Sequence, residues 1–177
     1  MLLPSEMTPR IFASDPATGA ILMERIWPGT TLAQSDLSDS AKTEIFIGFR
    51  RAIANLPTAQ CLPLADYFRQ SALPDQREPG FLHGDLHPEN ILLGPQETWL
   101  LIDPKGLVGE PCFEAVAWLR NPLVGRERII HLRQRLQQLH EAFGWSINRM
   151  IEWSLIDQLE CDEPDAEFLA AMHDNLT

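Results

Sequence analysis

The stretch Phe81-Leu-His-Gly-Asp-Leu-His-Pro-Glu-Asn90 and the later segment Ile102-Asp-Pro-Lys-Gly106 decide the fold of this chain. Between them lie two short apolar runs, Ile91–Leu93 and Trp99–Ile102, which are separated by Gly94-Pro95-Gln96-Glu97. Apolar runs of this length on either side of a Gly-Pro turn predict a tight β-hairpin. A tight hairpin brings its two ends together, so the residues that flank it should lie close in space.

Three polar residues of this segment supply what phosphoryl transfer requires. The transferred group carries spread negative charge, so a divalent cation must neutralise it and a carboxylate must orient the attacking hydroxyl and accept its proton. Asp85 lies in a loop and can act as the base, whereas Asn90 and Asp103 offer the hard oxygen ligands that Mg²⁺ prefers. Although Asn90 and Asp103 are thirteen positions apart in the sequence, the hairpin predicts that they are neighbours.

The rest of the chain predicts strands first and helices afterwards. Residues 10–26 predict a hairpin with a turn at Asp15–Gly19, and Met23 is expected in the core. Residues 36–55 predict a helix capped by Asp36 or Ser35, and residues 63–72 predict a shorter helix.

After residue 111 the apolar spacing is helical. Gly144 should end one of these helices, Ser146 should cap the next, and Pro164 should open the last. The predicted fold class is α+β, with a mostly helical body into which the central hairpin is inserted.

Composition narrows the possible partners. The formal net charge is −11, from 25 acidic and 14 basic residues, which argues against nucleic acid or an anionic membrane and fits a cationic small molecule better. Neither a signal peptide nor an apolar run of about 18 residues is present in the sequence. Three scattered cysteines, Cys61, Cys112 and Cys161, form no CxxC pair and predict reduced thiols and a cytoplasmic location.

These motifs resemble a known family. HGDLHPEN resembles the HxDxxxxN catalytic loop of the aminoglycoside phosphotransferases, and IDPKG resembles their metal-binding aspartate segment. The string IDPKGLVGEP, followed by LRNP, is most similar to the streptomycin-type and hydroxyurea-type antibiotic kinases, and DPATGAILMERIWPG resembles their last N-lobe hairpin and hinge. The resemblance covers about residues 8–160. It implies a protein-kinase-like fold, with residues 1–27 as a remnant N-lobe hairpin and hinge and residues 28–177 as the C-lobe.

The resemblance also implies ATP and Mg²⁺ as cofactors and a role for each residue. Asp85 would be the catalytic base, His83 would support the loop, and Asn90 and Asp103 would hold Mg²⁺. Other implied contacts are adenine at the hinge residues Glu24 and Ile26, phosphate at Lys105, and a cationic antibiotic at Glu152, Asp157 and Glu160. Glu114 stands where many relatives carry an aspartate, which we interpret as a minor structural change.

The implied function is ATP- and Mg²⁺-dependent phosphorylation of a hydroxyl on a small molecule, such as the aminoglycoside streptomycin. The alternative is a truncated, inactive kinase remnant that acts as a binding or oligomerisation module, because no lysine precedes residue 28 to bind ATP phosphates. Exposed apolar surface would then favour a homodimer through the hairpin at residues 10–26. The pattern His83-x-Asp85-x-His87 leaves open a zinc or iron site, which needs further ligands.

Overall fold

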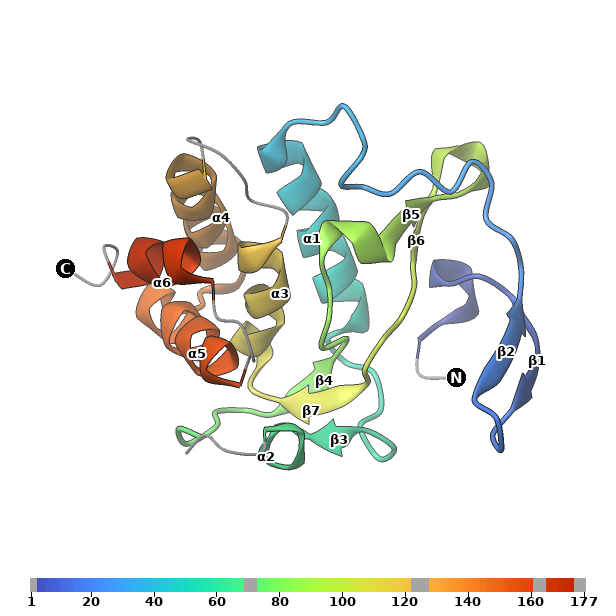
Figure 1. Ribbon diagram of the computed structural model, residues 1–177, viewed down its shortest axis with the longest axis horizontal. Helices are drawn as coiled ribbons and strands as arrows, with labels where there is room; N and C mark the ends of the chain where they lie inside the picture. Colours follow the sequence, from blue (N-terminus) through green and yellow to red (C-terminus); the bar gives the residue numbers. More distant parts are fainter. Residues whose placement is uncertain (1–2, 69–72, 122–127, 161–164, 174–177) are drawn as a thin grey trace.

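The computed structural model describes residues 3–68, 73–121, 128–160 and 165–173, which form a helical body with three small sheets (Figure 1). The first sheet is a hairpin of β1 (Ile11–Asp15) and β2 (Ala20–Met23). In its turn the Asp15 carboxylate accepts the Ala17 N–H at 3.0 Å and the Thr18 hydroxyl at 2.7 Å. The hairpin predicted near the N-terminal end is therefore confirmed.

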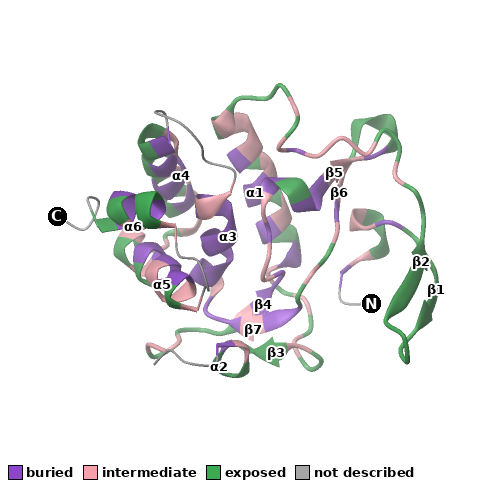
Figure 2. Cartoon of the chain, in the orientation of Figure 1, coloured by how far each residue is buried: buried purple, intermediate pink, exposed green. Residues whose placement is uncertain are grey.

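This hairpin stands apart from the helical body, and every residue of its two strands is exposed (Figure 2). The prediction that Met23 lies in the core is wrong, since 45% of its surface is accessible. Phe12 and Leu22 are 58% and 62% exposed. The apolar character of these strands therefore does not reflect burial within the described part of this chain.

The hairpin predicted between the two decisive motifs is also confirmed, as β5 (Ile91–Leu93) and β6 (Trp99–Leu101). On its other edge, β5 bonds to the chain that leads into the first helix. The Leu93 N–H donates to the Thr30 carbonyl at 2.8 Å, and the Leu32 N–H donates to the Ile91 carbonyl at 2.8 Å. Pairing on both edges fixes β5, and with it the residue that precedes the strand.

The third sheet was not predicted. Its central strand β7 (Leu107–Gly109) runs parallel to β3 (Leu62–Pro63) and antiparallel to β4 (Gly80–Leu82). The HGDLHPEN motif begins directly after β4, and the IDPKG segment ends directly before β7. Because these two strands pair, the two motifs are held side by side.

The first long helix, α1 (Asp39–Ile53), begins later than the sequence suggested. Its N-cap is Ser38, whose hydroxyl accepts the Ala41 N–H at 3.2 Å, so the prediction of Asp36 or Ser35 is wrong. Ser38 has an extended backbone and lies directly before the first helical residue, so its hydroxyl can accept the N–H of the third helical residue, Ala41. The short helix α2 spans Leu64–Tyr67. Residues 69–72, also assigned to this helix, lie outside the described residues.

The helical half of the chain follows the prediction. It contains α3 (Ala115–Arg120), α4 (Arg128–Phe143), α5 (Ile147–Leu159) and α6 (Ala166–His173), with short 3-10 turns elsewhere. Gly144 follows α4 with φ +69, and the Ser146 hydroxyl accepts the Arg149 N–H at 3.4 Å, as expected for a helix end and an N-cap. Pro164 and Cys161 lie outside the described residues.

The core lies between α1, α3, α4 and α5. The Phe46 and Trp118 rings pack with centroids 4.8 Å apart, and Trp153 and Phe168 are fully buried. Arg135 of α4 links two other helices within this core. It pairs with Asp39 of α1 at 2.5 Å and donates to the Trp118 carbonyl of α3. No helix in the described ranges is both long and apolar enough to cross a bilayer.

Candidate active site

The loop after β4 is held by His83, which is fully buried. Its Nε2 lies 3.0 Å from the Ile102 carbonyl, and its Nδ1 accepts the Asp85 N–H at 3.3 Å. A carbonyl only accepts, so Nε2 carries the proton and Nδ1 does not. Burial lowers the pKa of His83 to about 4, against the opposing effects of the Ile102 carbonyl and Asp85. The imidazole is therefore neutral at pH 7.

These two bonds bear on the alternative of a zinc or iron site. Both ring nitrogens of His83 are already engaged with the main chain, so neither is available to a metal without breaking a buried hydrogen bond. The second histidine of the pattern, His87, has its Nε2 3.8 Å from Asp85. Among the residues that the structure describes, no three His, Cys, Asp or Glu side chains gather as a metal-binding cluster.

Glu114 holds the main chain of the loop that follows β4. Its carboxylate accepts the main-chain N–H groups of His83 at 2.8 Å and of Gly84 at 2.9 Å. Glu114 is 2% exposed, and burial raises the pKa of its carboxyl despite the Arg50 guanidinium and the two N–H groups. The sequence did not predict that Glu114 accepts these two N–H groups. The available signal was a lone acid within an apolar run.

Gly84 lets the chain turn between His83 and Asp85. Its φ is +83, and a Cβ at this position would lie 2.8 Å from the Leu107 side chain. A larger residue would therefore meet both a strained backbone and a steric clash. The position of the Asp85 carboxylate thus depends on glycine at 84.

Asn90 and Asp103 are neighbours, as the hairpin predicted. The Ile102 N–H donates to the Asn90 carbonyl at 3.0 Å, which sets Asn90 opposite the residue before Asp103. The Asn90 side-chain N–H₂ donates to the Asp85 carbonyl at 2.9 Å, which leaves its amide oxygen available to a metal ion. Asp103 is exposed, and within the described part of the chain its carboxylate makes no hydrogen bond or ion pair.

The donor set at this end of the hairpin suits Mg²⁺. This ion usually takes one or two carboxylates and completes its octahedron with water and phosphate oxygens. The amide oxygen of Asn90 and the carboxylate of Asp103 are hard ligands of that kind. Asp103 has φ +58, an uncommon backbone conformation of the kind that gathers at functional sites.

Asp85 itself is engaged by a lysine. Lys105 Nζ lies 3.2 Å from Asp85 Oδ2 and 5.7 Å from the centre of the Tyr67 ring. Burial alone would lower the pKa of Lys105, but the Asp85 carboxylate and the Tyr67 hydroxyl outweigh it and raise the pKa above its ordinary value. The Lys105 N–H also donates to the His83 carbonyl at 2.8 Å. The sequence did not suggest this contact between Lys105 and Asp85.

The three acidic residues expected to contact a substrate, Glu152, Asp157 and Glu160, lie in different places in the structure. Asp157 lines the same small cavity of about 30 Å³ as Asp85 and Lys105. Burial raises the pKa of Asp157, against the effect of Arg120, whose Nη1 lies 2.7 Å from its carboxylate. Glu152 lines a different pocket, and Glu160 follows the end of α5.

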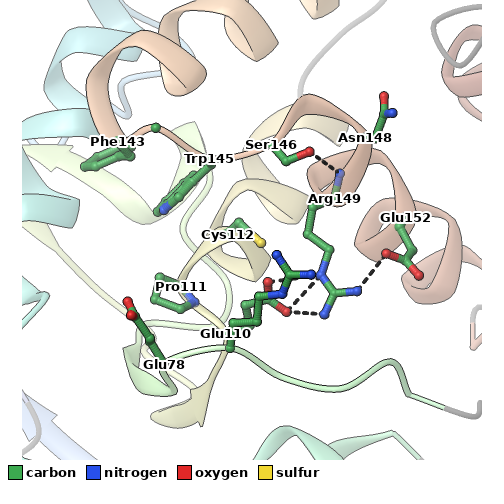
Figure 3. Close-up of a pocket in the computed structure, with 12 residues that line it drawn as sticks. Glu78, Glu110, Pro111, Cys112, Phe143, Trp145, Ser146, Asn148, Arg149 and Glu152 are labelled. Carbon is green, nitrogen blue, oxygen red and sulfur yellow. Dashed lines mark hydrogen bonds and ion pairs between the residues drawn. The ribbon is translucent and has the colours of Figure 1, made fainter.

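The pocket at Glu152 is open and has a volume of about 910 Å³ (Figure 3). One wall is the Phe143–Trp145 ring pair, with centroids 4.3 Å apart. Arg149 donates to the Glu110 carboxylate and pairs with Glu152 at 2.7 Å, as the dashed lines show. Glu152 is therefore already engaged in an ion pair within the protein, with the guanidinium that also holds Glu110.

The expected adenine-binding residues lie at the end of the exposed hairpin. The Glu24 N–H donates to the Arg10 carbonyl at 2.7 Å, so that N–H group already belongs to the strand pairing. Ile26 is half-buried, and Gly29 just beyond it donates to the Leu93 carbonyl at 2.9 Å. The hinge segment thus runs directly into the chain that pairs with β5.

Known proteins resemble this chain over the segment that contains these residues. Residues 49–161 match the model of the aminoglycoside/hydroxyurea antibiotic resistance kinase family. A streptomycin 3''-kinase from Klebsiella pneumoniae is 32% identical over 174 residues, covering 81% of this chain and 65% of that protein. A streptomycin 6-kinase from Streptomyces glaucescens is 27% identical over 205 residues, covering 91% of this chain and 66% of that protein.

A hydroxyurea phosphotransferase from Kitasatospora aureofaciens is 54% identical over 80 residues, which cover 44% of this chain and 22% of that protein. The chain thus spans no more than about two thirds of the length of these curated relatives. The family match covers most of the chain and includes the HGDLHPEN motif, the β5–β6 hairpin and the Asp103 segment. This chain belongs to the aminoglycoside/hydroxyurea antibiotic resistance kinase family.

Proposed function

We propose that this chain carries the catalytic centre of an ATP- and Mg²⁺-dependent phosphotransferase that acts on a hydroxyl of a small antibiotic such as streptomycin. The observation that carries the proposal is the convergence of Asp85, Asn90 and Asp103, which come together because β5 and β6 pair and β4 lies beside β7. The relatives described above support the same class of reaction, since two are named streptomycin kinases and one is named a hydroxyurea phosphotransferase.

In this proposal the acceptor hydroxyl approaches the Asp85 carboxylate, which orients it and takes its proton as the oxygen attacks. The new bond forms between that oxygen and the terminal phosphorus of ATP, while the bond from phosphorus to the ADP oxygen breaks. Asn90 and Asp103 would hold Mg²⁺, which neutralises charge on the phosphates when bound. His83, neutral and fixed by two hydrogen bonds, keeps the Asp85 main chain in place.

A cationic acceptor is supported by the net charge of the whole chain, which is −11. Positively charged molecules are attracted to such a protein during approach. Within the cavity, the Asp85 and Asp157 carboxylates are paired with Lys105 and Arg120, so a cation would be attracted to them only once these pairs open. Streptomycin and hydroxyurea therefore make a useful pair of test acceptors, because the first is cationic and the second is not.

The test is transfer of labelled phosphate from [γ-³²P]ATP to streptomycin or hydroxyurea, with the product mass measured. Replacement of Asp85 by Asn should lower turnover by about 10²–10⁴-fold without unfolding the protein, because the carboxylate is partly exposed. No transfer with either acceptor, in a chain that is folded and binds ATP, would contradict the proposal. It would favour the alternative of a binding module without catalysis.

A further inference from the structure

The contact between Lys105 and Asp85 leaves the proposed base occupied. Asp85 Oδ2 carries the Lys105 ammonium at 3.2 Å, and His87 lies 3.8 Å from the other oxygen. The cavity around them has a volume of about 30 Å³, which is room for a water molecule or two but not for an antibiotic. In this arrangement an acceptor hydroxyl cannot take the position of the ammonium group.

Lys105 can move away from Asp85 without a change in the main chain. Its side chain is 40% exposed, and a lysine ammonium moves freely on its flexible four-carbon stem. Its backbone stays fixed, because the N–H groups of Lys105 and Gly106 both donate to the His83 carbonyl, at 2.8 and 3.2 Å. The ammonium group is therefore the mobile part of a rigid turn.

The same ammonium can reach a phosphate held at Asp103. Lys105 follows Asp103 by two positions, and two residues of chain span at most about 7 Å. Lys42 and Lys105 are the only lysines in the chain, and the Lys42 ammonium donates to the Ala33 carbonyl at 3.1 Å. Lys105 is therefore the only lysine whose ammonium lies at the catalytic loop.

We propose that Lys105 is a latch on Asp85, closed in the free protein and opened by the phosphates of the bound nucleotide. With the latch closed, the ammonium rests between Asp85 and the Tyr67 ring and keeps the base from an acceptor. Nucleotide phosphates draw the ammonium toward Asp103, and Asp85 Oδ2 becomes free for the hydroxyl. This inference rests on the proposed function, since it needs a nucleotide at the Asn90–Asp103 end of the hairpin.

The two lysines make a direct test possible. Reductive methylation with ¹³C-formaldehyde labels Lys42, Lys105 and the terminal amine of the whole chain, and a Lys105→Arg variant identifies the Lys105 signal in a carbon–proton NMR spectrum. In the free protein, Asp85→Asn should move the Lys105 signal and leave the Lys42 signal in place. With a non-hydrolysable ATP analogue and Mg²⁺ bound, the Lys105 signal should shift, and Asp85→Asn should no longer affect it. AMP, which lacks the outer phosphates, is the control and should not shift it.

The outcomes separate this inference from the proposed function. If Asp85→Asn leaves the Lys105 signal of the free protein unchanged, the latch is wrong. If calorimetry shows the analogue bound while the Lys105 signal still responds to Asp85, the latch is wrong and the proposed nucleotide site stands. If the analogue produces neither heat nor any shift at millimolar concentration, both fail. Where the latch holds, Lys105→Gln should weaken binding of the ATP analogue on the order of tenfold, and Lys105→Arg should restore part of the loss.

Discussion

The imidazole of His83 donates its Nε2 proton to the Ile102 carbonyl at 3.0 Å and thereby ties the proposed catalytic loop to the chain that leads into the proposed metal-binding segment. The other ring nitrogen accepts the Asp85 N–H at 3.3 Å. The buried His83 ring thus links Asp85, the proposed base, to the residue before Asp103, the proposed metal ligand. Both hydrogen bonds require the neutral ring, because a protonated Nδ1 could not accept the Asp85 N–H.

The free energy of unfolding should decrease as the pH is lowered, over a window set by the two pKa values of His83. Its pKa is about 4 in the folded protein and 6.5 in the reference state, so the unfolded chain takes up the proton first as the pH falls. Stability is then fully present above about pH 6.5 and is lost towards pH 4, by roughly 3 kcal/mol. Urea unfolding at a series of pH values measures the slope.

The control for that experiment is His83→Gln, which does not titrate. Its amide can still donate to the Ile102 carbonyl, so the variant keeps one of the two hydrogen bonds. We expect a lower stability at pH 7, by about 1–3 kcal/mol, and a flatter dependence between pH 6.5 and 4. An equal slope in both proteins would assign the pH dependence to other groups.

Replacement of Glu114 by Ala should destabilise the protein strongly. It leaves the N–H groups of His83 and Gly84 without their acceptor in a buried site, which costs about 2–5 kcal/mol for the two together. Glu114→Gln keeps one acceptor oxygen and should lose less. Thermal unfolding of both variants checks this order, and an alanine variant as stable as the parent would contradict the anchoring role.

Arg50 offers a second test of the same site. It is 3% exposed, its Nε and Nη1 have no hydrogen-bond partner among the described residues, and it attracts Glu114. A double-mutant cycle with Arg50→Met and Glu114→Gln should show coupling, because each change alone leaves a buried charge without its counter-charge. Additive losses would mean that the two groups do not sense each other.

The backbone at Asp103 should tolerate Asn but not Val. Its φ of +58 suits Asp, Asn and Gly and strains a β-branched residue. We expect Asp103→Asn to change the free energy of unfolding by less than about 0.5 kcal/mol, and Asp103→Val to lower it by about 1–3 kcal/mol. Equal stability of the two variants in urea unfolding would count against a strained turn.

The exposed hairpin should promote self-association, and we propose a homodimer through it. Both strands expose apolar side chains, and each has an open edge that can pair with another strand. Replacing Phe12 and Leu22 by Ser should lower the apparent mass by light scattering at high concentration. A parent protein that is monomeric at the same concentration would rule the proposal out.

The sequence predicted the elements whose cause is local. The β5–β6 hairpin follows from two apolar runs around a Gly-Pro turn, and the boundary between α4 and α5 follows from Gly144 and Ser146. The neighbourhood of Asn90 and Asp103 followed from the hairpin alone.

What the sequence missed depends on contacts between distant segments. The pairing of β7 with β4 joins residues more than twenty positions apart, and three-residue strands give no periodic pattern. The Glu114 anchor and the Lys105–Asp85 contact exist only once those strands have paired. The prediction for Met23 was wrong because an apolar strand indicates a buried face, but the sequence does not show which surface covers that face.

The most direct test of the central claim is calorimetric titration of ATP with Mg²⁺ into the parent chain and into Asp103→Asn, the variant that should keep the fold intact. The account predicts one-to-one binding to the parent, with affinity at least about tenfold weaker in the variant. Equal binding to both proteins would remove Asp103 from the metal site. No binding to the parent at millimolar nucleotide would mean that this chain by itself is not a kinase.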